Sequence, residues 1–565
     1  MSSPESSVPA QTVRRYRERV FAERDRLLAA QRDTAEHQRL VLADLLAHNA
    51  DTAFGRAHDF ARIRTLDEYR RAVPIRDYAG LEPWIERGAA GERRVLSSDD
   101  PVLYFTSSGS TGAHKKVPIT ARFMRTSFFP FFYAAWAPMA EHFPELIDRR
   151  DTVLNLKHDP RPVVATTAAG HPHLGASQVD FGTVFGEPMS AEPGTAAPWA
   201  STPSFADPAD HLDKVYLRLR RAVEGADVRC VIGINPAMVA ALPYQLRMWW
   251  SDIVREIHDG TLGGRPYGPG NPARARELDE LASRFPVVRP AHVWPRMKAL
   301  FCWTTGLAGL YLPRLREEFG VGVTVLPAPV AASEGPVGVA LDRHGSAGGL
   351  VVTAAAYEFL DADTPVTPDA ETLRPHELEP GREYHVVFSH VGGLYRYSVG
   401  DVVRVVDFAN GAPRVAYAGR DTVVDRHGER LRESQVIRAI AAALDGGGLE
   451  ARNAACHAPA DGGRYEFAIA TDLPWTRTEG DDLAGRLDAV LSRESGGYRA
   501  ARAAGRLGTP VVRRLDGEAF LRDWHERVRA GVRPAQVKDR VWYLDPPTWQ
   551  ALVGSAEHID EESHV

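Results

Sequence analysis

Residues 104–120, YFTSSGSTGAHKKVPIT, are the stretch on which the interpretation of the whole chain depends. Hydroxyl and glycine residues lie here between an apolar segment expected to be a strand and an apolar segment expected to be a helix, and Lys115 and Lys116 close the run. Backbone N–H groups, hydroxyl donors and a cation are the parts of a phosphate-binding loop. The spacing is not the Walker pattern GxxxxGK[ST], and a flexible turn is the common alternative for a glycine–serine run.

Outside this loop, the chain alternates short β-branched segments with longer helical stretches between residues 101 and 420, which is typical of an α/β fold. Its 565 residues exceed what one core usually holds, because single cores stop growing beyond roughly 250 to 300 residues. We therefore expect a large, multi-layer N-terminal domain over 1–418, with a helical lead-in over 10–95, and a small α+β C-terminal domain over 419–565.

The composition of the chain limits the kinds of partner that the protein is expected to bind. Lys and Arg total 68 against 74 Asp and Glu, so the net charge is −6 and no broad basic face for nucleic acid is expected. Three distant cysteines (Cys230, Cys302 and Cys456) fit a reducing compartment and no zinc site. The most apolar stretch, 128–140, contains two prolines and falls short of the roughly 20 residues of a membrane span. We expect a cytoplasmic monomer or weak dimer that binds no membrane.

The pattern aromatic-x-S-S-G-S-T-G followed by lysine resembles the phosphate loop of adenylate-forming enzymes. Segments 45–60, 73–85 and 392–405 are similar to one branch, the acyl-acid amido synthetases first known as auxin-responsive proteins in plants. The resemblance runs from about residue 40 to 541 and is looser over 160–275. It implies a mobile small domain, ATP and Mg²⁺ as cofactors, and formation of an acyl-adenylate from which an amine displaces AMP. The Ala-, Arg- and Gly-rich usage indicates a bacterial member.

For the loop, the resemblance implies contacts with the β- and γ-phosphates. Lys115 or Lys116 would supply positive charge, and Ser108 would have a catalytic part. The residues expected to wrap the phosphates are Ser107, Ser108, Gly109, Ser110, Thr111 and Gly112.

A second motif, VAASE at 330–334, resembles the family's aromatic-containing motif ending in Ser-Glu. By this resemblance Glu334 would coordinate Mg²⁺, a role suited to a hard oxygen ligand, and Val330, Ala331, Ala332 and Ser333 would contact the nucleotide. Val330 stands where the family usually has the ring that stacks on adenine. A helix cap is the common alternative for an isolated Ser-Glu pair.

A third motif, YRYSVGD at 395–401, is expected to form a strand that presents Asp401 at its C-terminal end. By this resemblance, Asp401 would accept hydrogen bonds from both ribose hydroxyls, because a carboxylate has two acceptor oxygens. It also gives GRD at 419–421 the role of a hinge at which Arg420 touches the ribose or phosphate. A strand-end turn and a charged interdomain turn are the alternatives.

Near the C-terminus, QVKDR at 536–540 resembles a family segment whose lysine reaches the α-phosphate and the substrate carboxylate, which makes Lys538 the candidate catalytic cation. Val537 and Asp539 replace the family's aromatic residue and proline. A surface lysine in a charged tail is the competing interpretation.

No fixed sequence motif marks the pocket for the carboxylic acid substrate. Phe132 and Trp136 come from an aromatic-rich segment that is typical of a core as well as of a pocket, and Trp303 and Thr304 follow an apolar strand. We expect these four residues to contact a small carboxylic acid, and we expect an amine or amino acid as second substrate. The hypothesis is an ATP-dependent amide synthetase for biosynthesis. The alternatives are a ligase that forms a thioester with CoA or a carrier thiol, and a nucleotide-binding relative that has lost catalysis.

Overall fold

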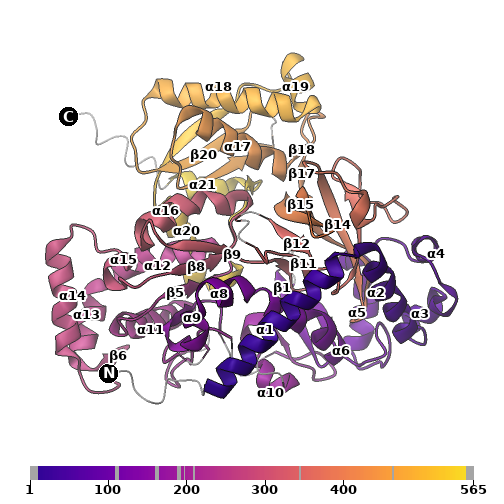
Figure 1. The fold of residues 1–565 in the computed structure, drawn as a ribbon. Helices are drawn as coiled ribbons and strands as arrows, with labels where there is room; N and C mark the ends of the chain where they lie inside the picture. Colours follow the sequence, from indigo (N-terminus) through magenta and orange to yellow (C-terminus); the bar gives the residue numbers. More distant parts are fainter. Residues whose placement is uncertain are drawn as a thin grey trace.

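The computed structural model has a large body with a smaller C-terminal part beside it (Figure 1). The expected phosphate-contacting residues 109–112 lie outside the part of the chain that the structure describes. The described residues are 10–108, 114–159, 165–186, 192–195, 197–207, 210–342, 345, 347–460 and 463–554.

Helices form the expected lead-in. They are α1 (Ala10–Gln31), α2 (Thr34–Asn49), α3 (Ala53–Ala57), α4 (Leu66–Ala72) and α5 (Tyr78–Ala89). Helices α2 to α5 begin after Asp33, Thr52, Thr65 and Asp77, whose side chains each accept a backbone N–H three residues on. These N-caps satisfy donors that a helix start leaves unpaired, so the local sequence fixes where the helices begin.

A seven-stranded antiparallel sheet carries most of the predicted motifs. Its order is β10-β11-β12-β16-β15-β14-β13, and α2 packs on β13 and β14 while α5 contacts β15. Every residue of β14 is buried, its polar residues Glu383, His385, Ser389 and His390 included, so both faces of this strand lie inside the protein. The strands are β10 (Val330–Ala332), β11 (Gly335–Val339), β12 (Gly348–Leu350), β13 (Ala356–Asp361), β14 (Glu383–His390), β15 (Leu394–Ala409) and β16 (Ala412–Arg420).

A second, parallel sheet lies beside it in the order β3-β5-β8-β9. In an open parallel sheet, ligands bind at the carboxyl ends of the strands, and Trp303 follows the last residue of β8. Its strands are β3 (Val153–Asn155), β5 (Cys230–Ile232), β8 (Ala299–Cys302) and β9 (Thr324–Pro327). The helices around it include α11 (His211–Glu224), α12 (Pro236–Met248), α13 (Trp250–Asp259), α14 (Pro272–Arg284) and α16 (Leu312–Phe319).

One expectation about the glycine–serine loop is wrong. The segment after the loop is a strand, not a helix: β1 (Leu103–Ser108) pairs antiparallel with β2 (His114–Ile119), and β4 (His173–Leu174) completes a three-stranded sheet. Val117 and Ile119 are buried. Their alternation at the end of β2 is a strand period, and the helices begin only at Ala121.

The chain leaves the seven-stranded sheet at Arg420 and then builds separate sheets with a core of their own. A short hairpin is followed by the mixed sheet β21-β20-β19-β22, which α17 and α18 cover (Figure 1). The elements are β17 (Val423–Val424), β18 (Leu431–Arg432), α17 (Glu433–Gly447), β19 (Asn453–His457), β20 (Glu466–Thr471), α18 (Arg477–Glu494), α19 (Gly496–Ala503), β21 (Val511–Asp516), α20 (Ala519–Arg529), β22 (Trp542–Tyr543) and α21 (Pro546–Gly554).

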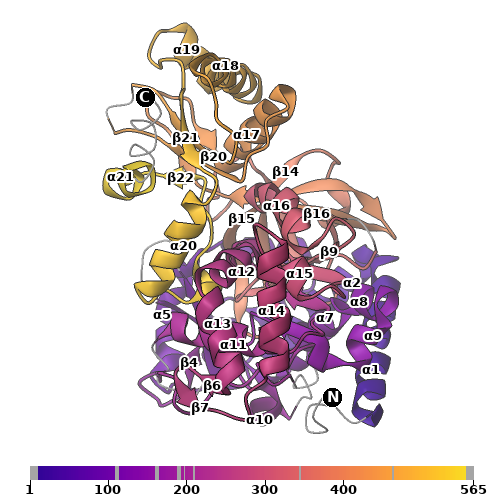
Figure 2. The ribbon, with the colours of Figure 1, turned by 90° about the vertical axis from the view of Figure 1, so that its left-hand side faces the viewer.

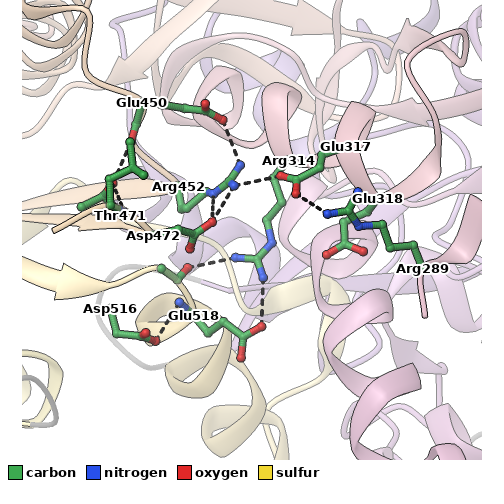
Figure 3. Close-up of polar contacts among 12 residues, drawn as sticks. Arg289, Arg314, Glu317, Glu318, Glu450, Arg452, Thr471, Asp472, Asp516 and Glu518 are labelled. Carbon is green, nitrogen blue, oxygen red and sulfur yellow. Dashed lines mark hydrogen bonds and ion pairs between the residues drawn. The ribbon is translucent and has the colours of Figure 1, made fainter. Parts of the chain in front are cut away.

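Helix α20 extends from this part onto the large body, where it lies beside α12 (Figure 2). Its Leu521, Trp524 and Val528 belong to the same apolar core as α11 and α12. Ionic contacts surround this seam (Figure 3). Arg314 of α16 donates to the Gly517 carbonyl at 2.9 Å, and Arg452 contacts Glu317 at 2.8 Å.

Candidate functional site

Asp401 and Arg420 meet because β15 and β16 bring them opposite each other in the sheet. Arg420 Nη1 lies 2.9 Å from Asp401 Oδ1, and this carboxylate is the main cause that raises the pKa of Arg420. The sequence predicted Asp401 at the C-terminal end of its strand, but β15 continues to Ala409. Gly400, at φ +76°, bends the strand there, so the motif forms a kink inside a long strand.

Glu334 lies in the tight turn that joins β10 to β11, and its side chain is buried. Tyr397 O–H donates to Glu334 Oε1 at 3.4 Å. His390 Nε2 donates to the Glu334 carbonyl at 2.9 Å, and burial lowers the pKa of His390 to about 4. A neutral histidine with its proton on Nε2 therefore fixes the backbone of the turn at neutral pH.

Lys538 reaches the same region from the C-terminal part. Its Nζ lies 5.0 Å from the centroid of the Trp303 ring, within cation–π range. Asn235, the N-cap of α12, donates to the Val537 carbonyl at 2.6 Å and anchors the preceding backbone. Lys538 is exposed at the surface, and partial desolvation by the surrounding chain is the main cause that lowers the pKa of its ammonium.

These residues form one charged group. Asp401 and Glu334 both act on the pKa of Lys538 to raise it, and Arg420 acts to lower it. Glu334 also contributes to the raised pKa of Arg420. Two carboxylates and two cations, which come from three motifs between residues 330 and 421 and from the C-terminal segment, thus share a local electrostatic field.

Asp539, the residue that departs from the family pattern, is held by partners from both parts of the chain. Its carboxylate is hydrogen-bonded to Tyr311 and Asn453, and Asn453 Nδ2 donates to the Tyr311 hydroxyl at 2.8 Å. Burial raises the pKa of Asp539 to about 6. The carboxylate next to Lys538 therefore has a structural role that the sequence did not reveal, because Tyr311 and Asn453 carry no motif.

The two loop lysines have protein partners. Lys116 Nζ lies 2.6 Å from a Glu86 carboxylate oxygen, and its backbone N–H donates to the Tyr78 hydroxyl at 2.9 Å. Lys115 Nζ lies 5.3 Å from the centroid of the Tyr78 ring. Ser107 and Ser108 end β1 opposite Lys115 and His114. The described part of the loop thus places both lysines at the α5 side of the hairpin.

The four residues expected to contact the acid differ in their surroundings. Trp136 is 1% exposed and its ring centroid lies 4.6 Å from that of Phe301, so it packs within the large core. Phe132 is half-buried. Trp303 Nε1 donates to the Pro329 carbonyl at 3.0 Å, and the Thr304 hydroxyl donates to Gly345 O at 2.5 Å. The nucleotide-contact candidates Val330, Ala331, Ala332 and Ser333 are also half-buried.

Arg396 is a structural residue that sequence reasoning did not single out. It is buried at φ +43°, and its Nε lies 3.0 Å from Glu358 Oε1. It also donates to the Val73 carbonyl at 2.9 Å, which ties the helical lead-in to β15. Its partners come from distant elements, so no local pattern indicates its structural role. In the sequence, Arg396 was covered only by the segment 392–405 that resembles the family.

The donor set around Glu334 fits Mg²⁺. Magnesium usually takes one or two protein carboxylates and completes its shell with waters and substrate phosphates. Glu334 supplies such a carboxylate beside the Asp401–Arg420 pair. Among the described residues, no group of three or more His, Cys, Asp or Glu side chains is arranged to hold a metal ion without such added ligands.

No helix in the described ranges is both long and apolar enough to cross a bilayer. The three cysteines are buried and unpaired.

The fold is shared with solved structures over nearly the whole chain. The structure is similar to that of a GH3.15 acyl acid amido synthetase, with a TM-score of 0.77 over 94% of this chain and 95% of the other, at 19% identity. The same fold is found in a GH3.15 complex with 2,4-DB, at a TM-score of 0.77. The chain therefore has a mixed α/β, GH3-like fold.

The sequence comparisons give the family. The GH3 family N-terminal domain matches residues 23–323, and the GH3 family central domain matches residues 349–420. The chain belongs to the GH3 family of adenylate-forming acyl acid amido synthetases, which use ATP.

Curated relatives match most of the chain. A probable indole-3-acetic acid-amido synthetase, GH3.12 of Oryza sativa subsp. japonica, is 27% identical over 90% of this chain and 91% of its own length. An indole-3-acetic acid-amido synthetase, GH3.2 of Arabidopsis thaliana, is 25% identical over 71% of this chain.

Proposed function

We propose that this protein is an ATP-dependent amide synthetase that activates a carboxylic acid as an acyl-adenylate, releases pyrophosphate, and transfers the acyl group to an amine or amino acid with release of AMP. The observation that carries the proposal is the convergence of Glu334, the Asp401–Arg420 pair and Lys538. Membership of the GH3 family supports the reaction type. The identities of the acid and the amine stay open, because the curated relatives share about a quarter of their residues with this chain.

The proposed roles follow from charge and position. Asp401 accepts the ribose hydroxyls, and Arg420, held by Asp401, contacts the ribose or a phosphate. Glu334 holds Mg²⁺, which when bound would neutralise phosphate charge. Lys538 stabilises the negative charge that develops as the substrate carboxylate attacks the α-phosphate. The glycine–serine loop, with Ser107, Ser108 and Lys115, binds the outer phosphates.

We also propose that residues 419–565 act as a small domain that rotates between the two half-reactions. The chain leaves the seven-stranded sheet at Arg420, and the following core is built from separate strands, which supports a hinge at 419–421. Hinge rotation would withdraw Lys538 after adenylation and open the site to the amine. Cytoplasmic location, bacterial origin and a monomeric or weakly dimeric state stay predictions.

The test is a product analysis. Purified protein is incubated with ATP, Mg²⁺ and a panel of carboxylic acids, together with either amino acids or CoA, and AMP, pyrophosphate and acyl products are measured. The proposal expects AMP release coupled to an amide. A thioester without amide would establish the alternative ligase. ATP binding without AMP release for any acid would indicate a relative that has lost catalysis.

A further inference from the structure

Backbone hydrogen bonds hold the start of α5 against β15. The Arg76 N–H donates to the Arg396 carbonyl at 3.0 Å, and the Ser398 N–H donates to the Arg76 carbonyl at 2.8 Å. These two bonds lie on either side of Tyr397, whose hydroxyl donates to Glu334 Oε1. The start of α5 is therefore placed by the part of β15 that contacts the predicted Mg²⁺ ligand.

Tyr78 is the first residue of α5, and Asp77 fixes that position. The Asp77 carboxylate caps the helix by accepting the Gly80 N–H at 3.0 Å. Because the cap fixes where the helix begins, it also limits the directions in which the half-buried Tyr78 side chain can leave the backbone. Burial is the main cause that raises the pKa of Tyr78, and the charge of Glu334 contributes to the rise. Tyr78 thus lies within the electrostatic field of the Glu334 carboxylate.

The Tyr78 hydroxyl contacts the free edge of the sheet that carries the glycine–serine loop. Strand β2 is the edge strand in the order β2-β1-β4. The Lys116 N–H of β2 donates to the Tyr78 hydroxyl at 2.9 Å. An edge strand has backbone groups without a strand partner, so an acceptor on a fixed helix sets the position of the strand relative to that helix.

The side chains of the two lysines at this edge have different partners on α5. Lys116 Nζ lies 2.6 and 2.9 Å from the two carboxylate oxygens of Glu86, which compensate its charge. Lys115 Nζ lies 5.3 Å from the centroid of the Tyr78 ring, and no carboxylate in the described ranges pairs with it. A neutral ring orients an ammonium without compensating its charge, so Lys115 is the cation of this pair that can meet an anion.

We propose that Tyr78 is a positioning residue of the nucleotide site: its hydroxyl holds β2 against α5, and its ring directs the Lys115 ammonium toward the outer phosphates of ATP. This role rests on the proposed function, since ATP must occupy the site. The two lysines then have different parts, because Lys115 meets the nucleotide while Lys116 and Glu86 attach the hairpin to the helix. One tyrosine thereby links the hairpin to the strand that contacts Glu334.

Nucleotide binding tests this role, and it is measured without a carboxylic acid so that the result does not depend on the reaction. An ATP analogue with a methylene bridge between the α- and β-phosphates, which cannot form an adenylate, is titrated with Mg²⁺ into the full-length protein by calorimetry. AMP is titrated in the same way. AMP lacks the phosphates that Lys115 is expected to meet, so it separates a positioning effect from general damage to the site.

Tyr78→Leu is expected to weaken binding of the ATP analogue about 5- to 30-fold, the range for one cation–π contact, and to leave AMP binding within about twofold of wild type. Tyr78→Phe keeps the ring and is expected to bind the ATP analogue within about threefold of wild type. Tyr267→Leu is the matched control, because it removes a tyrosine ring that also lies near a cation, Arg221 at 5.1 Å, between α13 and α14. It is expected to bind both nucleotides as wild type does.

The hydroxyl is tested separately by hydrogen exchange. Peptides over residues 114–119 are expected to exchange faster in Tyr78→Phe than in wild type, because the Lys116 N–H loses its acceptor. Unchanged exchange would overturn the part given to the hydroxyl. Circular dichroism with thermal unfolding establishes that each variant is folded.

A double-mutant cycle identifies the group through which Tyr78 acts. Lys115→Met is expected to weaken binding of the ATP analogue at least about tenfold in wild type, the effect of losing a hydrogen bond between charged groups. In the Tyr78→Leu background the same change is expected to have an effect at least about threefold smaller. Equal effects in the two backgrounds, or equal losses of the ATP analogue and AMP in folded Tyr78→Leu, would overturn the proposal.

The outcomes for Tyr78 and for the proposed function are distinguishable. Wild type that binds the ATP analogue but forms no amide would contradict the proposed function and leave the positioning role standing. Amide formation by wild type, together with equal effects of Lys115→Met in the two backgrounds, would overturn the positioning role alone. Wild type that does not bind the ATP analogue would overturn both.

Discussion

The ammonium of Lys538 lies 5.0 Å from the centre of the Trp303 indole ring, which follows strand β8 of the parallel sheet. A residue near the C-terminus is thus positioned by the carboxyl end of a strand more than 230 residues earlier. Asn235 fixes the neighbouring backbone by its hydrogen bond to the Val537 carbonyl. The contact between Lys538 and Trp303 holds the lysine in the orientation in which it lies at the site.

Trp303→Leu is expected to lower the rate of adenylation about 3- to 30-fold, because a cation–π contact contributes about 0.5 to 2 kcal/mol. Trp303→Phe keeps an aromatic face and is expected to retain most of the rate. Both variants lose the hydrogen bond to the Pro329 carbonyl, so their difference isolates the ring face. Acid-dependent pyrophosphate release measures the rate. Equal rates in the two variants would show that the ring does not position Lys538.

Glu358→Gln is expected to destabilise the large body by about 3 to 5 kcal/mol, the effect of breaking a buried ion pair. Glu358 is buried and accepts from Arg396 Nε at 3.0 Å and from Arg70 Nε at 2.9 Å, so the change leaves Arg396 without its counter-charge. Urea unfolding followed by circular dichroism measures the loss. Glu36→Gln removes the exposed pair with Arg39 and is the control, with no measurable shift expected. Similar midpoints for both variants would contradict the role of Arg396.

Asp539 makes stability depend on pH in a defined direction. Its pKa is raised to about 6 from 3.8, so the fold favours the protonated acid. Its contribution is fully present below about pH 4 and is lost as the pH rises through about 6. Asp539→Asn keeps a hydrogen-bonding side chain and removes the charge. The variant is expected to gain on the order of 1–3 kcal/mol relative to wild type between pH 4 and pH 7.

Thermal unfolding midpoints of wild type and Asp539→Asn at pH 4, 5, 6 and 7 measure this gain. The comparison within each pH cancels the groups that the two proteins share. A difference that stays constant from pH 4 to pH 7 would show that Asp539 is not desolvated in the fold.

Arg314→Ala is expected to loosen the seam between α16 and the C-terminal part. Arg314 is buried and donates to the Gly517 carbonyl at 2.9 Å and to Glu518 at 3.2 Å, as Figure 3 shows. Hydrogen exchange of peptides over residues 514–524 is expected to become faster, because the first turn of α20 loses its anchor. Arg316→Ala, exposed on the same helix, is the control. An unchanged exchange rate in Arg314→Ala would show that Arg314 does not anchor the first turn of α20.

Some of the fold was predictable because its determinants are local. The N-caps at Asp33, Thr52, Thr65 and Asp77 precede their helices in the sequence, and the helices begin there. The motif around Asp401 was located correctly as a strand, although its kink at Gly400 was not foreseen. A positive φ at one glycine inside a strand depends on the neighbouring strand as well as on the glycine itself.

Other features depend on contacts between distant segments. Lys116 was expected to face phosphate, but in the structure it pairs with Glu86 on α5, a partner that no local pattern indicates. Asp539 appeared as a departure from a motif, whereas its hydrogen bonds come from Tyr311 and Asn453 on separate elements. Tyr397 belongs to the YRYSVGD motif, but its contact with Glu334 could be predicted only from the order of the strands in the sheet.

The central claim, that Lys538 completes an acid-activating site with Glu334 and the Asp401–Arg420 pair, is tested most directly by ATP–pyrophosphate exchange. Lys538→Ala is compared with wild type and with Lys298→Ala, an exposed lysine at the opposite end of β8. The account predicts acid-dependent exchange in wild type and Lys298→Ala, and a loss of about 10²- to 10³-fold in Lys538→Ala, the usual effect of removing one stabilising donor. Exchange at the wild-type rate in folded Lys538→Ala would contradict it.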